Sequence, residues 1–173
     1  MKSGKVWDMF NIGDKVVYGK TGVCTIEDKC EKEIIKNEKR LYYVLKPQSN
    51  PNSTIFAPVD SQKVFIRHIM TKDEAEKLIL EIPDISGRAT DIELSREQYE
   101  TMIATHNCED LVGLTYRLYT KRMSDIENRK KPGFVDEKYL LLAEKLLFGE
   151  LSAALGIPFD EVKDYIGIKL NNK

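Results

Sequence analysis

The chain has 173 residues, a length that fits one domain or two small ones. Hydrophobic residues make up 42% of it, enough for a core, and 27 basic against 28 acidic residues give a net charge of −1, which excludes a general attraction to nucleic acid. No apolar run reaches the roughly 18 residues of a membrane span, and the first residues lack the apolar stretch of a secretory signal. We therefore expect a cytoplasmic protein without membrane contact.

Short strands separated by turns are predicted up to about residue 68. Gly19 and Gly22 can supply positive φ angles in a turn. The expected strands cover 15–18, 23–30, 41–45, 54–57 and 64–66. One face of the second strand is expected to carry Cys24, Ile26, Asp28 and Cys30. Four or five short strands within about 60 residues predict a small antiparallel barrel.

The apolar residues recur with a helical period from Thr71 onward. Thr71 and Ser95 each precede a glutamate or glutamine by three residues, the pattern of a capping box, so each is predicted to begin a helix. A linker is predicted between these two helices, from Pro83 to Thr90, because proline interrupts the helical pattern.

Three further helices are predicted. Asn107 is expected to cap the third helix, and Lys131–Gly133 to end it. Its apolar face, expected to lie in a core, consists of Val112, Tyr116, Tyr119, Met123 and Ile126. The fourth helix is expected to stop at Gly156, and Pro158 to begin a short last helix through Tyr165.

Catalytic chemistry has little support in the sequence. The three cysteines, Cys24, Cys30 and Cys108, show neither a disulfide framework nor the spacing of a zinc site. We interpret His68 and His106, the only histidines, as structural or surface residues. The Gly-Lys-Thr triplet at 19–21 lacks the upstream glycine of a P-loop. We therefore expect no enzyme, no catalytic residue, no metal, no cofactor and no small-molecule substrate.

The two halves of the chain differ in charge. Residues 1–80 hold 14 lysines and arginines against 11 acidic residues, a net +3, and residues 81–173 hold 13 against 17, a net −4. Basic residues nevertheless crowd the third predicted helix and its end, at Arg117, Lys121, Arg122, Arg129, Lys130 and Lys131. A phosphate-contacting patch and an ordinary solvated face are equally compatible with this pattern.

Residues 9–18, MFNIGDKVVY, resemble the opening of the CarD/CdnL family of bacterial transcription regulators that bind RNA polymerase. The likeness spans residues 9–156 in order. It continues through Gly22–Val23, Tyr42–Lys46, Pro58–Val59, Ile66–Arg67 and 136–152. Residues 1–8 precede the usual start of the family at Met9, so we treat them as an extension or as added sequence and leave Trp7 out of the argument.

The resemblance and the strand and helix patterns together predict an α+β protein of two domains. The first is a small antiparallel Tudor/SH3-like β barrel, similar to the interaction domain of transcription-repair coupling factors, and the second is an all-α helical bundle. The expected parts are the extension at 1–8, the β domain at 9–69, a helix and linker at 70–90, the helical domain at 91–168 and a tail at 169–173.

The resemblance implies that the β domain binds the RNA polymerase β subunit through strand-edge and side-chain contacts. Lys32 falls where the family often has a basic residue on its polymerase-facing strand, whereas Phe56 replaces a residue that is usually basic. The candidate polymerase-binding residues are Lys32, Tyr43, Ile55, Phe56 and Arg67.

The resemblance also implies that the helical domain contacts promoter DNA with an aromatic wedge and stabilises the open promoter complex. Ser95 stands at the position of the wedge tryptophan, and Glu97 and Glu100 replace nearby basic residues, so the expected DNA contact is weak. The candidate DNA-binding residues are Leu94, Ser95, Arg96, Arg117 and Lys121, and Ile92 is a second substitute for the wedge.

Two functions stay open at this point. The chain is either a CarD-like regulator that contacts polymerase and promoter DNA, or a polymerase-docking adaptor whose acidic helical half binds another protein. The sequence does not predict the oligomeric state.

Overall fold

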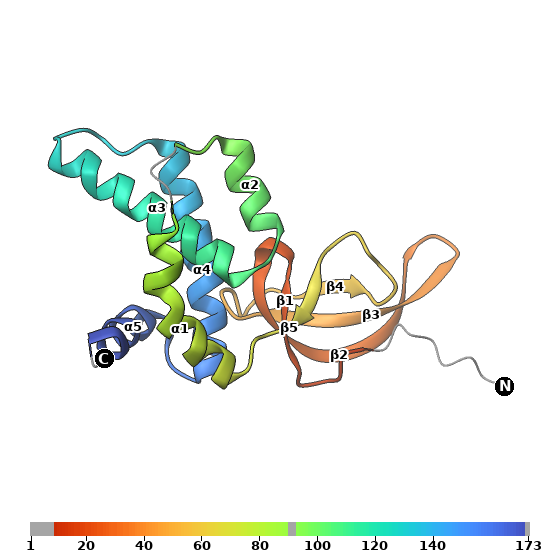
Figure 1. Cartoon of the computed structure of the whole chain (residues 1–173). Helices are drawn as coiled ribbons and strands as arrows, with labels where there is room; N and C mark the ends of the chain where they lie inside the picture. The colour runs from red at the N-terminus through yellow and green to blue at the C-terminus, as the bar shows by residue number, and fades with distance from the viewer. Residues whose placement is uncertain (1–8, 90–92, 172–173) are drawn as a thin grey trace. The chain divides into compact units, whose positions relative to one another are not determined.

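A computed structural model describes residues 9–89 and 93–171 of the chain. The chain divides into two compact units, Met1–Ile69 and Met70–Lys173, which we call the β unit and the helical unit (Figure 1). Strands occur in the first unit and α-helices in the second, so the predicted α+β class is confirmed.

The β unit is a five-stranded antiparallel sheet, in agreement with the predicted four or five short strands. Its strand order is β4-β3-β2-β1-β5, so β4 and β5 are the outer strands. The second and third strands are longer than predicted, and the fifth begins two residues later than predicted. The strands are β1 (Lys15–Tyr18), β2 (Gly22–Ile35), β3 (Glu38–Pro47), β4 (Ile55–Pro58) and β5 (Ile66–His68).

One face of the sheet packs into the core of the β unit. The core residues are Phe10, Val16, Cys24, Ile26, Tyr43, Leu45 and Ala57. A β-bulge between Ile26 and Asp28 interrupts the alternation of side chains, because Ile26 pairs with Leu45 and Asp28 with Val44. The prediction that Asp28 and Cys30 share the face of Cys24 is therefore wrong, since the extra residue turns both to the opposite face.

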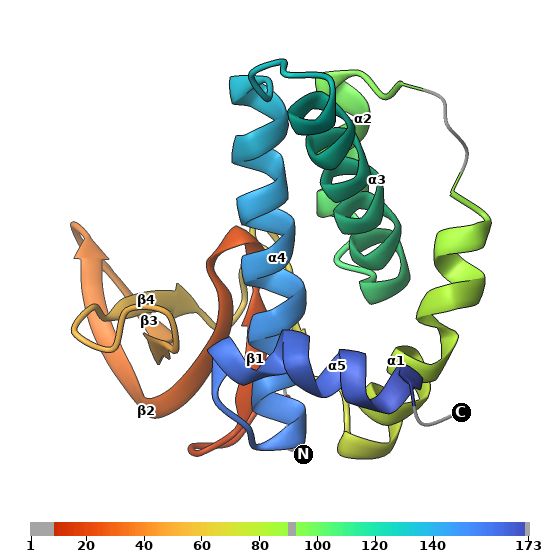
Figure 2. The same ribbon diagram turned by 90° about the vertical axis from the view of Figure 1, so that its left-hand side faces the viewer.

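In the described residues of the helical unit, five α-helices pack around one core (Figure 2). They are α1 (Lys72–Gly87), α2 (Arg96–Ala104), α3 (Cys108–Glu127), α4 (Phe134–Leu155) and α5 (Val162–Asn171). Thr71 and Ser95 form the two predicted capping boxes, and the Asn107 side chain accepts a hydrogen bond from the backbone of Glu109 at the start of α3. Gly156, at φ 70°, ends α4 as predicted.

The predicted linker at Pro83–Thr90 is wrong for its first half. Pro83 lies inside α1, which continues to Gly87. Proline cannot donate the helical hydrogen bond to Ile79, but Ile85 beyond it is buried in the core, and this packing outweighs the local preference. Helix α3 ends at Glu127, before the predicted stop, and α5 extends beyond Tyr165.

The predicted apolar face of α3 is only partly in the core. Val112 is buried, whereas four residues of the same face are exposed: Tyr116, Tyr119, Met123 and Ile126. The core uses instead Leu111, Leu114 and Leu118, which are buried on a neighbouring face of the helix. Spacing along a helix identifies a shared face but not what covers it.

Candidate functional site

Strand alternation divides β3 and β4 between two faces of the sheet. Tyr43, Leu45 and Ala57 face the core. Their neighbours Tyr42 and Val44 pair with Pro58 and Phe56 and point the other way. We call this second face of β2, β3 and β4 the outer face, and it consists of Asp28, Cys30, Lys32, Arg40, Tyr42, Val44, Phe56 and Pro58.

Lys32 and Phe56 meet on the outer face. Lys32 lies in β2 and Phe56 in β4, and the Lys32 ammonium lies 3.5 Å from the centroid of the Phe56 ring. The side chain therefore crosses over β3 and places its charge on the face of the ring, an attractive cation–π arrangement. Two residues that are 24 positions apart in the sequence thus form one contact.

Charged residues at the rim of the outer face are mostly paired. Arg40 forms an ion pair with Glu38, which raises the pKa of the Arg40 guanidinium, and Lys46 lies 3.1 Å from Glu27. Among the residues that the structure describes, no carboxylate forms an ion pair with Lys32. The outer face therefore presents the exposed side chains of Lys32 and Asp28 beside the half-buried Phe56, whereas its Tyr42 is buried. The cation next to an apolar side chain suits a partner with an acidic residue next to apolar ones.

Tyr43 and Ile55, both predicted to contact a partner, lie on the core side of the sheet. The Tyr43 side chain is 3% exposed, and its ring packs edge-to-face on Phe10 at a centroid distance of 5.8 Å. The Tyr43 ring therefore stabilises the core, and its contact with a partner stays a prediction. Ile55 is half-buried against the same core, at the start of the outer strand β4.

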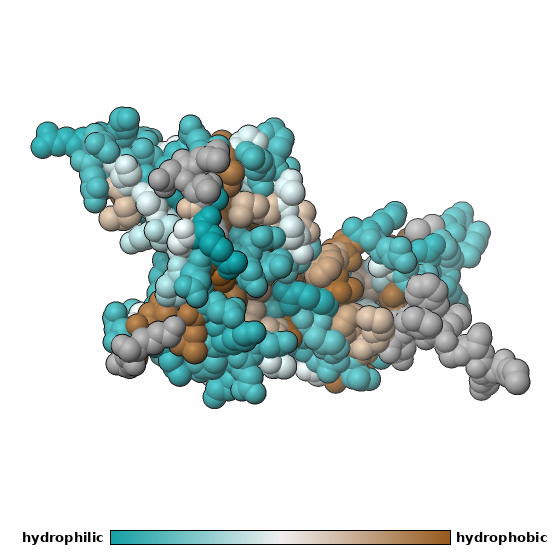
Figure 3. Space-filling view, in the orientation of Figure 1, coloured by the Kyte–Doolittle hydropathy of each residue, from teal (hydrophilic) through white to brown (hydrophobic). Residues whose placement is uncertain are grey.

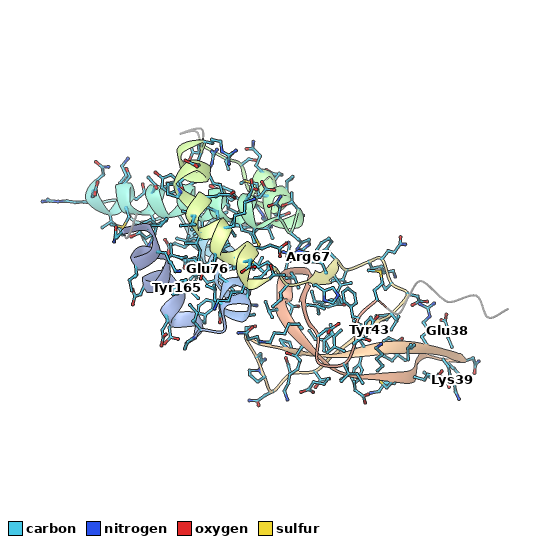
Figure 4. The ribbon with its side chains drawn as sticks, turned by 60° about the horizontal axis from the view of Figure 1, so that its bottom comes forward. Glu38, Lys39, Tyr43, Arg67, Glu76 and Tyr165 are labelled. Atoms are coloured by element: carbon cyan, nitrogen blue, oxygen red, sulfur yellow. The ribbon has the colours of Figure 1, made fainter. Side chains whose placement is uncertain are left out.

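The two edges of the sheet offer different surfaces. Strand β4 pairs with β3 on one side, and in the described part of the chain the sheet has no further strand beyond it. Such an edge can pair with a strand of another protein. Arg67 lies in β5 at the other end of the strand order, and its guanidinium donates to the carbonyl of His68 at 3.0 Å. Figure 4 shows Arg67 far from Glu38 and Lys39 at the tip of the β2–β3 hairpin.

The predicted DNA-binding residues at the start of α2 have structural roles. The Ser95 hydroxyl caps α2 by accepting from the backbone of Gln98, and Leu94 is half-buried against the helical core. Arg96 is exposed but lies 3.4 Å from Glu100, which also accepts a hydrogen bond from the Tyr139 hydroxyl at 2.6 Å. Ile92, the second wedge candidate, lies outside the described residues.

Lys121 is held by two carboxylates. Its ammonium lies 2.8 Å from Glu93 and 2.8 Å from Asp136, and both hydrogen bonds raise the pKa of Lys121. Asp136 also accepts a hydrogen bond from the Tyr99 hydroxyl at 2.9 Å. The charge of Lys121 is therefore already neutralised, which disfavours the predicted phosphate contact.

Leu94, Arg117 and Lys121 nevertheless line one cleft of about 560 Å³ in the helical unit. Arg117 is half-buried there. Acidic residues share the walls, with Glu93 and Asp125 on the same cleft. The structure thus brings three of the five predicted DNA-binding residues together, but in a cleft of mixed charge, while Ser95 and Arg96 lie outside it.

Sequence reasoning missed Arg40, Tyr42 and Val44 as members of the outer face. The signal was present, because alternation along 41–45 places Tyr42 and Val44 opposite Tyr43.

Within the described ranges, no three histidine, cysteine, aspartate or glutamate side chains gather in a group that could hold a metal ion. None of the helices in residues 9–89 and 93–171 is long and apolar enough to cross a bilayer.

Comparison with known proteins identifies the first unit. Residues 10–70 match the family model of the CarD-like/TRCF RID domain. The match covers nearly all of the described β unit and none of the helices from α1 onward. A search of curated proteins finds no significant match to the chain.

Proposed function

Residues 10–70 belong to the CarD-like/TRCF RID domain family, which interacts with RNA polymerase, and on this premise we propose that the β unit docks on the polymerase β subunit. The observation that carries the proposal is the outer face, where the exposed Lys32 ammonium lies on the half-buried Phe56 ring beside the open edge of β4. Backbone pairing at the edge would supply affinity, and the pair would supply specificity.

We also propose that the β unit forms the small antiparallel barrel predicted from the sequence. We infer that the sheet curls in the Tudor-like manner without closing, so that β4 and β5 approach each other but do not pair and the edge of β4 stays open. In support, one cavity of about 250 Å³ is lined by Ala57 and Pro58 of β4 and by Ile66 of β5, with Phe10 and Tyr43 among its other walls. This curvature would present the outer face as a convex surface for docking.

A competition binding assay against a polymerase β fragment tests the docking. We expect saturable binding of the full chain, and at least tenfold weaker binding for Lys32→Glu and for Phe56→Ala, because each removes half of the Lys32–Phe56 pair. Lys20→Glu is the matched control, since Lys20 is an exposed lysine of the same unit outside the outer face. Equal losses for Lys20→Glu and Lys32→Glu would show that only overall charge matters and would refute the proposed surface.

For the helical unit we propose modulation of the open promoter complex through weak, non-sequence-specific DNA contact. A ligand that binds the melted promoter better than the closed duplex shifts that equilibrium by its difference in affinity alone. The support is the basic residues of α3 and its end, of which Arg129, Lys130 and Lys131 are exposed.

A second candidate, the polymerase-docking adaptor, is favoured by a specific observation. Lys121 is neutralised by Glu93 and Asp136, Arg96 is paired with Glu100, and Ser95 replaces the wedge tryptophan. An adaptor would use its acidic helical unit to bind another protein. In both cases we propose a binding protein and not an enzyme.

A further inference from the structure

Four large apolar side chains form a stripe from the middle of α3 to its C-terminal end. Tyr116, Tyr119, Met123 and Ile126 are 46%, 47%, 38% and 50% exposed, and their spacing of three or four residues places them on one face of the helix. Figure 1 shows the C-terminal turns of α3 projecting beyond α1 and α4. We call these four residues the α3 stripe, and an exposed apolar stripe of this kind indicates a binding surface.

A groove adjoins the N-terminal end of the α3 stripe. It has a volume of about 260 Å³ and is built from α1, α3, α4 and α5. Apolar side chains dominate its walls, among them Ile82, Val112, Leu147, Phe148 and Ile166, and Tyr116 and Tyr119 form its α3 wall toward the stripe.

The charge of the groove is already balanced. Glu144 and Lys163 are the only charged residues among its described lining, and their side chains lie 2.8 Å apart. Figure 3 shows hydrophobic residues at the surface over α5, within a face that is otherwise mostly hydrophilic. The groove therefore suits uncharged, apolar side chains.

The stripe of one molecule matches the groove of another. Helix α3 rises about 1.5 Å per residue, so Val112 in the groove and Ile126 in the stripe lie at equal distances, about 10 Å, on either side of Tyr119. A two-fold axis at Tyr119 with the two α3 helices antiparallel would place Ile126 of one copy over Val112 of the other, and Met123 over Thr115. The groove, at about 260 Å³, leaves room for apolar side chains of a second copy.

The charges at the two ends of α3 are complementary in the same arrangement. Glu109 at the start of α3 is exposed, and Arg129 and Lys130 just beyond its end are exposed. In the described part of the chain none of these three forms an ion pair. The two-fold axis at Tyr119 places Glu109 opposite Arg129 of the second copy. Parallel packing of the two α3 helices would instead place residues of the same charge next to each other.

We propose that the chain forms a two-fold symmetric dimer through α3, in which Met123 and Ile126 of each copy fill the groove of the other. The contact is isologous, because the same stripe and groove are used twice. It is independent of the docking of the β unit on polymerase, so either proposal can fail alone.

Sedimentation and light scattering of the full chain test the dimer. We expect a monomer–dimer equilibrium below about 200 μM and at least tenfold weaker association for Ile126→Asp. Ile168→Asp is the control, since Ile168 is also exposed but is not part of the groove wall. A chain that stays monomeric to about 200 μM, or a dimer that Ile126→Asp does not weaken, would overturn the proposal.

Charge exchange and cross-linking test the antiparallel register. Glu109→Arg should weaken the dimer several-fold, and adding Arg129→Glu and Lys130→Glu should restore it. Under oxidising conditions Tyr119→Cys should give a disulfide-linked dimer, because residues at the axis face each other, while Ser124→Cys on another face should not. If the charge exchange does not restore the dimer and Tyr119→Cys gives no cross-link, this register is contradicted. If the chain stays monomeric and binds a helix of another protein, the groove belongs to a different occupant and the dimer is refuted.

Discussion

Tyr99, Lys121 and Asp136 connect three helices through one carboxylate. Asp136 in α4 accepts hydrogen bonds from the Tyr99 hydroxyl of α2 and from the Lys121 ammonium of α3. Burial and this hydrogen bond raise the pKa of Tyr99 to about 12. At the scale of single residues, this network links α2, α3 and α4, and it includes Lys121, one of the predicted DNA-binding residues.

Tyr99→Phe is expected to lower the free energy of unfolding by about 1 kcal/mol at pH 8, because a buried hydrogen bond is lost. The pKa of Tyr99 is raised in the folded state, so its contribution is fully present below the unfolded value of ~10 and is lost as the pH rises toward about 12. At pH 11 ionisation of Tyr99 in the unfolded state lowers the free energy of unfolding of the wild type by about 1.4 kcal/mol. This decrease cancels the stability that the wild type has over Tyr99→Phe at pH 8.

Urea unfolding of both chains at pH 8 and pH 11 measures this difference. The wild type should be more stable at pH 8 and no more stable than Tyr99→Phe at pH 11. A stability difference that stays constant between the two pH values would contradict the raised pKa.

The neighbours Tyr42 and Tyr43 show how far single residues could be assigned from the sequence. Alternation predicts that they point to opposite faces, but it does not predict that both rings are buried. The structure buries Tyr43 against Phe10, a residue 33 positions away, and leaves Tyr42 only 4% exposed on the outer face. The Lys32–Phe56 contact depends in the same way on strand pairing, which composition alone does not reveal.

At the scale of elements, local signals predicted starts better than ends. The capping residues Thr71, Ser95 and Asn107 are local hydrogen-bond acceptors, and each begins a helix as predicted. The continuation of α1 through Pro83 could not be predicted, because it depends on the burial of Ile85 by other helices. The bulge after Ile26 likewise follows from pairing with β3.

Helix α3 carries the prediction that separates the two proposed functions. If the helical unit contacts DNA, duplex binding should be weak and should fall about 10–40-fold between 50 and 200 mM salt, as expected for two or three phosphate contacts. Arg117→Ala should remove about one phosphate contact and so reduce the slope of log affinity against log salt by about 1. Fluorescence anisotropy with a labelled duplex measures both quantities.

Lys77→Ala is the control for this measurement, since Lys77 is an exposed basic residue on α1, outside the cleft of Arg117. Equal effects of the two substitutions would mean that the cleft has no special role. Absence of duplex binding at low salt would favour the adaptor over the DNA-contacting regulator.

The whole molecule combines a β unit with a helical unit, and its two sequence halves, residues 1–80 and 81–173, carry net charges of +3 and −4. The sequence pattern predicted this two-part organisation, because the spacing of apolar residues changes from that of strands to that of helices near Thr71. The identity of the first unit followed from residues 9–18, which resemble a known family. The chemistry of the helical unit could not be predicted as well, because the neutralisation of Lys121 depends on residues 28 and 15 positions away.

Amide hydrogen exchange of the full chain, alone and with an excess of polymerase β fragment, tests the central claim most directly. Docking through the outer face and the β4 edge predicts slower exchange across β2, β3 and β4, with β5 unchanged. Protection confined to the helical unit, or none in β2–β4 under saturating conditions, would contradict the account.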